Sequence, residues 1–197
     1  MKKKAEVKTG ILISNLGTPD SYSPKDVRKF LKQFLSDPRV IKVPKWIWWF
    51  ILNGIILNTR SRRSAAAYQK IWTDQGSPLF LYCEKIVKAL INQCKNKSDN
   101  MHFALGMRYG SPSISDALNA LKIKGCERFV ILPLYPQYSY TTTASTKDEV
   151  MKTFLAWGET PDFKIICDYY DNQYYIDAIR DCIEAHWQQY GLSLIHI

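Results

Sequence analysis

The chain has 197 residues, of which 46% are hydrophobic and 23% are charged. This composition excludes a disordered chain, and the length suffices for one globular domain or for one domain and part of another. The formal net charge of +9 favours anionic partners such as nucleic acid, anionic lipid or a small carboxylated ligand, but charge alone does not choose among them.

Neither a membrane span nor a site built from cysteines is predicted. The longest apolar stretch, Trp46 to Leu57, is interrupted by Asn53 and Gly54, and a spanning helix needs about 20 apolar residues. The basic N-terminus lacks the cleavage site of a secretory signal. The five cysteines are widely spaced and odd in number, which favours reduced thiols. We therefore expect a cytoplasmic protein.

The first recognisable unit is a strand, a turn and a helix. The apolar run 11–13 predicts a strand that ends at the turn 17–19. Ser23 suits an N-cap, Pro24 suits the first helical position and Asp26 suits the first turn. One apolar helix face follows at helical spacing, formed by Val27, Phe30, Leu31, Phe34 and Leu35.

Strands and helices continue to alternate along the rest of the chain. Strands are predicted at residues 103–105, 129–132 and 163–167, and helices are predicted to begin at Ser77, Ser111 and about Gln173. In the last helix an apolar stripe is expected to face inward, formed by Ile176, Ile179, Ile183 and Trp187. The alternation predicts an α/β fold with a parallel sheet flanked by helices.

Ligands of parallel α/β sheets bind beyond the carboxyl ends of the strands, so the loops there are the candidate sites. The loop 15–19 holds one glycine and lacks the GxGxxG fingerprint of dinucleotide-binding enzymes. The loop 107–112 brings Arg108 and Tyr109 to a strand end, where they can pair with a carboxylate and form an aromatic wall. Such an arginine can equally cap a neighbouring helix, so both interpretations stay open.

The loop 133–143 is stiff and aromatic. Two prolines restrict its backbone, and three tyrosines follow with a run of hydroxyl residues. Such a surface suits a flat, apolar ligand with a polar rim. The alternative is a rigid turn that leads into a helix N-cap between Ser139 and Thr143.

An insertion at about residues 40–76, which we call the lip, is unusually rich in large apolar side chains. Ten of them lie in the segment from Trp46 to Leu57, and Arg60, Arg62 and Arg63 follow closely. An apolar surface beside a basic cluster can contact a membrane or admit an amphiphilic, carboxylated ligand. The alternative is a buried helical hairpin with a solvated basic end.

Five segments resemble bacterial ferrochelatases in the same order and at similar spacing: 15–19, 30–37, 76–78, 106–112 and 132–139. Each segment is weak alone, but together they cover about residues 8 to 190. The resemblance implies a lyase of haem biosynthesis that inserts Fe²⁺ into protoporphyrin IX to make protohaem, with no cofactor required. It also implies two Rossmann-like domains with the porphyrin between them.

The resemblance further implies which residues hold the porphyrin: Leu16, Arg60, Tyr68, Ser77, Arg108, Tyr109, Tyr138 and Ser139. Arg60 is expected to bind a propionate. No catalytic residue and no metal ligand is assigned, because the histidine and glutamate of the family are expected beyond this chain. His196 follows Gly191 too closely to be that histidine, and His102, before a strand, and His186, on a helix, are expected to be structural.

Under this interpretation residues 1–157 form the porphyrin-binding domain and residues 158–197 begin a second, truncated one, so the chain alone is expected to be inactive. The segment Trp46 to Leu57 is expected to allow peripheral contact with the inner face of the membrane. Alternatives are a related chelatase acting on another tetrapyrrole or metal, and a noncatalytic porphyrin- or haem-binding protein. A basic nucleic-acid-binding protein is disfavoured because no recognition helix or RNP-like motif is present.

Overall fold

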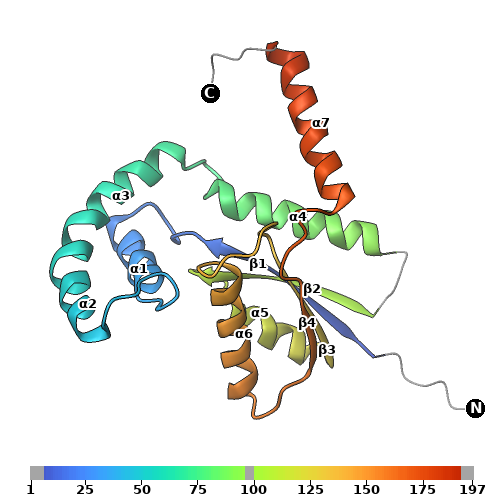
Figure 1. Ribbon diagram of the computed structural model, residues 1–197, viewed down its shortest axis with the longest axis horizontal. Helices are drawn as coiled ribbons and strands as arrows, with labels where there is room; N and C mark the ends of the chain where they lie inside the picture. The colour runs from blue at the N-terminus through green and yellow to red at the C-terminus, as the bar shows by residue number, and fades with distance from the viewer. Residues whose placement is uncertain (1–6, 96–99, 192–197) are drawn as a thin grey trace, which may run out of the picture.

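The computed structural model describes residues 7–95 and 100–191. Its centre is a parallel sheet of four strands in the order β2-β1-β3-β4 (Figure 1). The strands are β1 Thr9–Gly17, β2 Met101–Tyr109, β3 Arg128–Pro133 and β4 Asp162–Ile165. The predicted α/β class, a parallel sheet flanked by helices, is therefore confirmed.

Helix α4 lies on one face of the sheet, and α5 and α6 lie on the other (Figure 1). The lip extends to one side and packs on α1. The helices are α1 Pro24–Leu35, α2 Lys45–Ile51, the π-helix η1 Leu52–Ile56, α3 Leu57–Ile71, α4 Pro78–Cys94, α5 Ile114–Ile123, α6 Thr143–Ala156 and α7 Gln173–Tyr190. Within the described residues, no helix is long and apolar enough to cross a membrane.

The core lies between the sheet and the layer of α5 and α6. Its fully buried members alternate along the strands and repeat at helical spacing, as the sequence pattern requires. They include Leu12, Phe129, Ile131, Leu118, Leu121, Val150 and Phe154. Burial of each such side chain stabilises the fold by about 1.5–3 kcal/mol, so this layer fixes the sheet from which the candidate loops emerge.

Side-chain capping sets the starts of α1 and α5. The Ser23 hydroxyl accepts a hydrogen bond from the backbone N–H of Asp26, so the predicted start of α1 is confirmed. The predicted start at Ser111 is wrong by a few residues. Helix α5 begins after Ser113, because this serine and Asp116 form a reciprocal capping box that satisfies backbone donors of the first turn.

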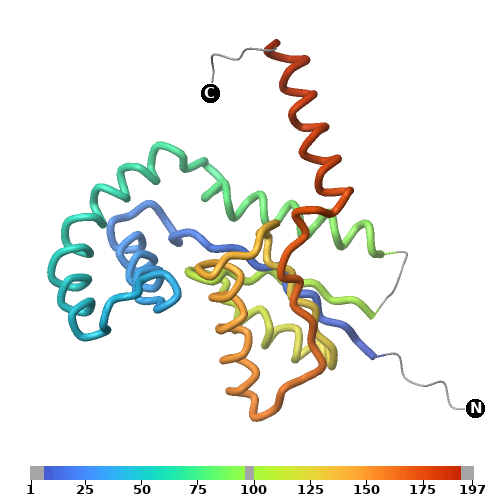
Figure 2. Tube along the Cα trace, viewed as in Figure 1, coloured from blue at the N-terminus to red at the C-terminus, as the bar shows by residue number. Residues whose placement is uncertain are grey.

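Two other predictions need correction. His102 lies within β2 and not before it. In α7 the stripe formed by Ile176, Ile179, Ile183 and Trp187 does not face inward, since these side chains are 41–47% exposed and α7 has no buried residue. Figure 2 shows the reason: α7 extends away from the sheet, so no described element covers this face.

Candidate functional site

The candidate loops meet at one edge of the sheet. Ile13 pairs with Leu105 on one side and with Leu132 on the other, so β1, β2 and β3 run in step toward that edge. The loops after β1 and β2 touch: a Cβ at Gly17, whose φ is +101°, would overlap the carbonyl oxygen of Tyr109. Only glycine combines this backbone conformation with so close an approach.

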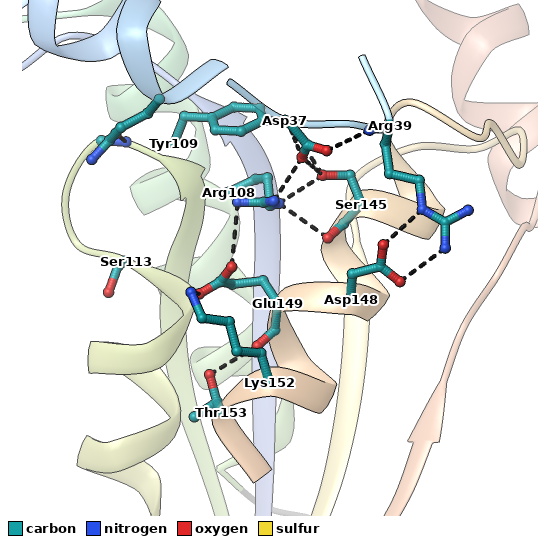
Figure 3. Close-up of polar contacts among 12 residues, drawn as sticks. Asp37, Arg39, Arg108, Tyr109, Ser113, Ser145, Asp148, Glu149, Lys152 and Thr153 are labelled. Atoms are coloured by element: carbon teal, nitrogen blue, oxygen red, sulfur yellow. Dashed lines mark hydrogen bonds and ion pairs between the residues drawn. The ribbon is translucent and has the colours of Figure 1, made fainter. Parts of the chain in front are cut away.

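The most densely bonded part of this edge is built around the carboxylate of Asp37, which follows α1 (Figure 3). Its Oδ2 accepts hydrogen bonds from Arg108 Nη2 at 2.6 Å, from the Tyr109 hydroxyl at 2.7 Å and from the Ser145 hydroxyl at 2.5 Å. Its Oδ1 accepts one from the backbone N–H of Arg39 at 2.7 Å. The end of β2, the first turn of α6 and the root of the lip are thereby joined at one side chain.

This network perturbs the ionisation of its members. Burial by itself would raise the pKa of the Asp37 carboxyl, but the hydrogen bonds from Ser145, Tyr109 and Arg39, with the charge of Arg108, lower that pKa below its usual value. Burial, aided by the neighbouring carboxylate, raises the pKa of the Tyr109 hydroxyl to about 12. Asp37 is therefore a buried anion and Tyr109 a neutral donor at neutral pH.

Arg108, which the sequence suggested as a ligand contact, has its guanidinium engaged inside the protein. Besides Asp37, it donates from Nε to the carbonyl and hydroxyl oxygens of Ser145 at 3.0 and 2.7 Å, and Nη1 lies 3.5 Å from Glu149. It also lies over the ring of Tyr109, 4.6 Å from the ring centre. Arg108 thus bonds to the first turn of α6 and does not cap the end of a helix.

A second ion pair ties the root of the lip to α6. The Arg39 guanidinium bonds both carboxylate oxygens of Asp148, at 2.6 and 3.0 Å (Figure 3). The same guanidinium lies 4.3 Å from the ring centre of Tyr140, and the ammonium of Lys42 lies 4.8 Å from it. The root of the lip is therefore held against the loop between β3 and α6.

The lip presents much of its apolar surface to solvent. Trp46, Trp49 and Phe50 are 70%, 59% and 64% exposed, whereas Leu52 and Leu57 are buried. The indole nitrogen of Trp48 donates to the carbonyl of Leu35 at 2.6 Å and so anchors α2 to the end of α1. The alternative of a buried helical hairpin with a solvated basic end is wrong, because Trp46, Trp49 and Phe50 are more than half exposed.

The predicted porphyrin contacts of the lip lie along α3 and just after it. Arg60 is exposed and lines a shallow hollow of about 380 Å³ with Arg63, Ser64 and Ala67. Tyr68 packs on Phe30 and Trp72, with ring centres 6.4 and 6.2 Å apart, and burial raises the pKa of its hydroxyl. These residues carry a cation and an aromatic wall on the same helix.

Ser77 is buried immediately before α4. It lines a cavity of about 270 Å³ together with Thr18, Trp72, Phe80 and Ser111. This cavity brings the turn after β1, the loop after β2 and the start of α4 together, as predicted for the carboxyl edge of the sheet. Arg60 and Ser77 line different cavities.

The remaining predicted contacts lie at the ends of β1 and β3. Leu16 is half-buried on β1, and Tyr138 is 55% exposed in the loop before α6. The Ser139 hydroxyl lies 3.1 Å from that of Thr141. The N-cap of α6 is Thr142, within the predicted range Ser139 to Thr143, but its side chain makes no capping hydrogen bond.

Two members of the site, Asp37 and Ser145, were missed by the sequence interpretation. An aspartate followed by proline and arginine between a helix and an apolar insertion is a weak signal for a turn, but it does not name its partners. Nothing in the sequence distinguishes Ser145 from the neighbouring hydroxyl residues, because its role depends on contact with residues 37 and 108, far away in the chain.

No described group of three or more His, Cys, Asp and Glu side chains could hold a metal ion. The Nε2 atom of His102 is buried and has no hydrogen-bond partner among the described residues. The ring of His186 lies 4.7 Å from that of Tyr190 on α7. His196 lies outside the described residues.

Comparison with known proteins was made for the whole chain. The family model Ferrochelatase matches residues 8–195. Curated ferrochelatases from Janthinobacterium sp. (strain Marseille) and Methylobacillus flagellatus are each 45% identical to the chain over 184 and 185 residues, which is 93% of the chain but 50% and 54% of those proteins. The ferrochelatase of Thioalkalivibrio sulfidiphilus is 43% identical over 183 residues, 92% of the chain and 50% of that protein.

Among solved structures, a protein from Marinobacter aquaeolei VT8, described as a cobalamin (vitamin B12) biosynthesis CbiX protein, is similar with a TM-score of 0.47 and 13% identity, over 92% of the chain and 98% of that protein. The chain spans about half the length of the curated relatives that it matches. The match to the family model nevertheless covers nearly all of its residues. The chain belongs to the ferrochelatase family.

Proposed function

We propose that this chain is the porphyrin-binding, N-terminal part of a ferrochelatase that inserts Fe²⁺ into protoporphyrin IX. The observation that carries the proposal is the family match over residues 8–195, with the relatives extending to about twice the matched length. Insertion replaces two pyrrole protons by one ferrous ion, so the reaction needs a base and a metal-delivering site in addition to a porphyrin pocket. The product is protohaem, and no cofactor is required.

The chain's part in this reaction is to hold the macrocycle. Arg60 is exposed and makes no ion pair among the described residues, so its charge is available to a propionate. Tyr68 and the exposed ring of Tyr138 offer aromatic walls, Leu16 offers an apolar one, and the hydroxyls of Ser77 and Ser139 suit the polar rim.

The proposed contributions of Arg108 and Tyr109 are narrower than those of Arg60. Because the Arg108 guanidinium and the Tyr109 hydroxyl are both bonded to Asp37, neither is available to pair with a propionate without breaking the network. Their role at the porphyrin is to support the pocket wall. A porphyrin carboxylate is thus expected to bind at Arg60 on the lip and not at the end of β2.

We also propose which residues of the chain form which domain. Residues 1–157, with the lip at about 40–76, would form the porphyrin-binding domain, and residues 158–197 would begin a second one. The base and the carboxylate that delivers iron would come from the part of the relatives that this chain does not match. The chain alone is then expected to bind porphyrin weakly and to insert no metal.

The exposed lip is the proposed site of peripheral contact with the inner face of the membrane. Trp46, Trp49 and Phe50 project apolar surface, and Arg60, Arg62 and Arg63 are all exposed close by in the sequence. Indole rings favour the headgroup region, and arginines are attracted to anionic lipid. A protoporphyrin carried in the membrane would reach Arg60 along the same surface.

The test uses protoporphyrin IX and Zn²⁺, a stable substitute for Fe²⁺, under anaerobic conditions in detergent micelles. We expect a shift in porphyrin absorbance and fluorescence on binding, weakened by Arg60→Ala and unaffected by Arg128→Ala, which removes an exposed cation at the opposite end of the sheet. Metalation should not exceed the protein-free rate. Absence of binding would overturn the proposal, and metalation would show that the base lies within this chain.

A further inference from the structure

The lip is joined to the rest of the described structure by packing on α1 and by hydrogen bonds at its root. Its helix α3 packs on α1, and η1 packs on both α2 and α3. Within the described ranges, the hydrogen bonds that link residues 36–76 to the sheet or to α6 come from two residues only, Asp37 and Arg39. Both stand at the root of the lip, before its first helix.

Both residues bond to α6, and Asp37 also bonds to the end of β2. Asp37 is 5% exposed, and its carboxylate holds the end of β2 and the first turn of α6 through Arg108, Tyr109 and Ser145. Arg39 reaches the next turn of α6 at Asp148. We call Asp37, Arg39 and these four partners the clamp.

The clamp is well suited to fix an angle as well as a position. Two carboxylate-centred contacts, made by Asp37 and Arg39 two positions apart in the root and received on successive turns of α6, restrain both translation and rotation of the segment that follows. Both oxygens of the Asp37 carboxylate accept hydrogen bonds from the protein, three at Oδ2 and one at Oδ1.

The clamp also lies between the two surfaces that the proposed function needs together. The lip carries Arg60 and Tyr68, and the loop that leads into α6 carries Tyr138 and Ser139. Arg39 and Lys42 stack on Tyr140 in that same loop. A substitution at Asp37 would therefore act on the separation of the lip from the loop while leaving the side chains of both surfaces unchanged.

We infer that Asp37 is a positioning residue: through the clamp it sets the lip at the distance from the loop 138–140 at which one porphyrin is contacted by both. This inference rests on the proposed function. Asp37 itself acts through Arg108, Tyr109 and Ser145 and is not expected to touch the porphyrin. The inference also gives a role to the ion pair between Arg108 at the end of β2 and the buried Asp37.

The experiment compares Asp37→Asn with Asp162→Asn, which makes the same chemical change at an exposed ion pair with Arg128, remote from the lip. Amide hydrogen exchange is measured for α2, α3 and β1 without porphyrin, and porphyrin binding is measured on the same samples. We expect Asp37→Asn to raise exchange in α2 and α3 about tenfold more than in β1, and to weaken protoporphyrin IX binding about tenfold. Asp162→Asn should change neither.

The exchange pattern separates positioning from general stability. If Asp37→Asn raises exchange in β1 as much as in α3, or leaves α3 unchanged, the inference is overturned. If the unsubstituted chain binds no porphyrin, the proposed function fails, and the exchange data still decide whether the clamp sets the lip. Should Asp37→Asn not fold, Asp148→Asn opens the exposed half of the clamp, and the same comparison applies with α2 and α3 as the reporters.

Discussion

At the scale of single residues, the buried carboxylate of Asp37 joins the end of β2, the first turn of α6 and the root of the lip. Sequence interpretation found Arg108 and Tyr109 correctly as side chains at the end of a strand, because the strand itself was evident from its apolar run. It could not find Asp37, since the hydrogen bonds that define it span 71, 72 and 108 positions in the chain. Long-range polar pairing leaves no periodic signal, whereas burial of a strand does.

The ionisation of Asp37 predicts how stability depends on pH. Its pKa is lowered in the folded chain, so its contribution is fully present above the unfolded pKa of about 3.9 and is lost as pH falls through that value toward the folded pKa. We expect urea unfolding between pH 3 and 7 to show a steeper loss of stability below about pH 4 in the unsubstituted chain than in Asp37→Asn. Equal slopes would contradict the assignment.

Loss of this carboxylate should be costly at neutral pH. Asp37→Asn leaves the half-buried Arg108 guanidinium without its closest anion, and breaking a buried pair in this way costs about 3 kcal/mol. Tyr109→Phe removes one hydrogen bond to the same anion and should cost about 1.5–2 kcal/mol. Chemical denaturation measures both. As a control, Asp162→Asn at an exposed pair should cost less than about 1 kcal/mol.

At the scale of elements, capping residues and apolar periodicity located the four strands and the helices α1, α4, α5 and α7, whereas α2, η1, α3 and α6 entered only through alternatives that the sequence left open. Helix α5 was placed a few residues early because Pro112 resembled a first-turn proline, whereas the capping box at Ser113 and Asp116 decides the start. The lip was recognised as an apolar insertion, but its exposure could not be deduced, since a membrane-facing surface and a buried hairpin have the same composition.

The exposed lip makes a prediction about membranes. Trp46→Ser with Trp49→Ser should change stability little, because both side chains are more than half exposed, yet should reduce cosedimentation with anionic phospholipid vesicles severalfold. Ile123→Ser, at an 86% exposed position on α5, is the matched control and should leave vesicle binding unchanged. If the double tryptophan variant and Ile123→Ser bind the vesicles equally well, the lip does not make the membrane contact.

At the scale of the whole molecule, the predicted sheet is present and its candidate loops lie at one edge, but no described element covers α7. Its apolar stripe was expected to face inward because amphipathic helices normally pack on a core. The expectation was wrong for the described residues. Apolar periodicity indicates that one face of a helix is suited to burial, but it does not identify the polypeptide segment that covers this face.

That face gives a test of the proposed two-domain organisation. The chain spans about half the length of its relatives, and α7 exposes Ile179, Ile183 and Trp187 along one side. If the rest of the second α/β domain packs here, the separately expressed C-terminal half of the Janthinobacterium relative should bind the chain and shift its tryptophan fluorescence to shorter wavelength in a way that Trp187→Phe reduces, since burial removes this indole from water. Ile183→Asp should abolish the complex, because an unpaired carboxylate would have to be buried.

The control is Asp181→Ala, which changes an exposed ion-pair position on the same helix and should leave the complex intact. A complex that tolerates Ile183→Asp would place the second domain elsewhere, and the apolar stripe of α7 would then need a different partner.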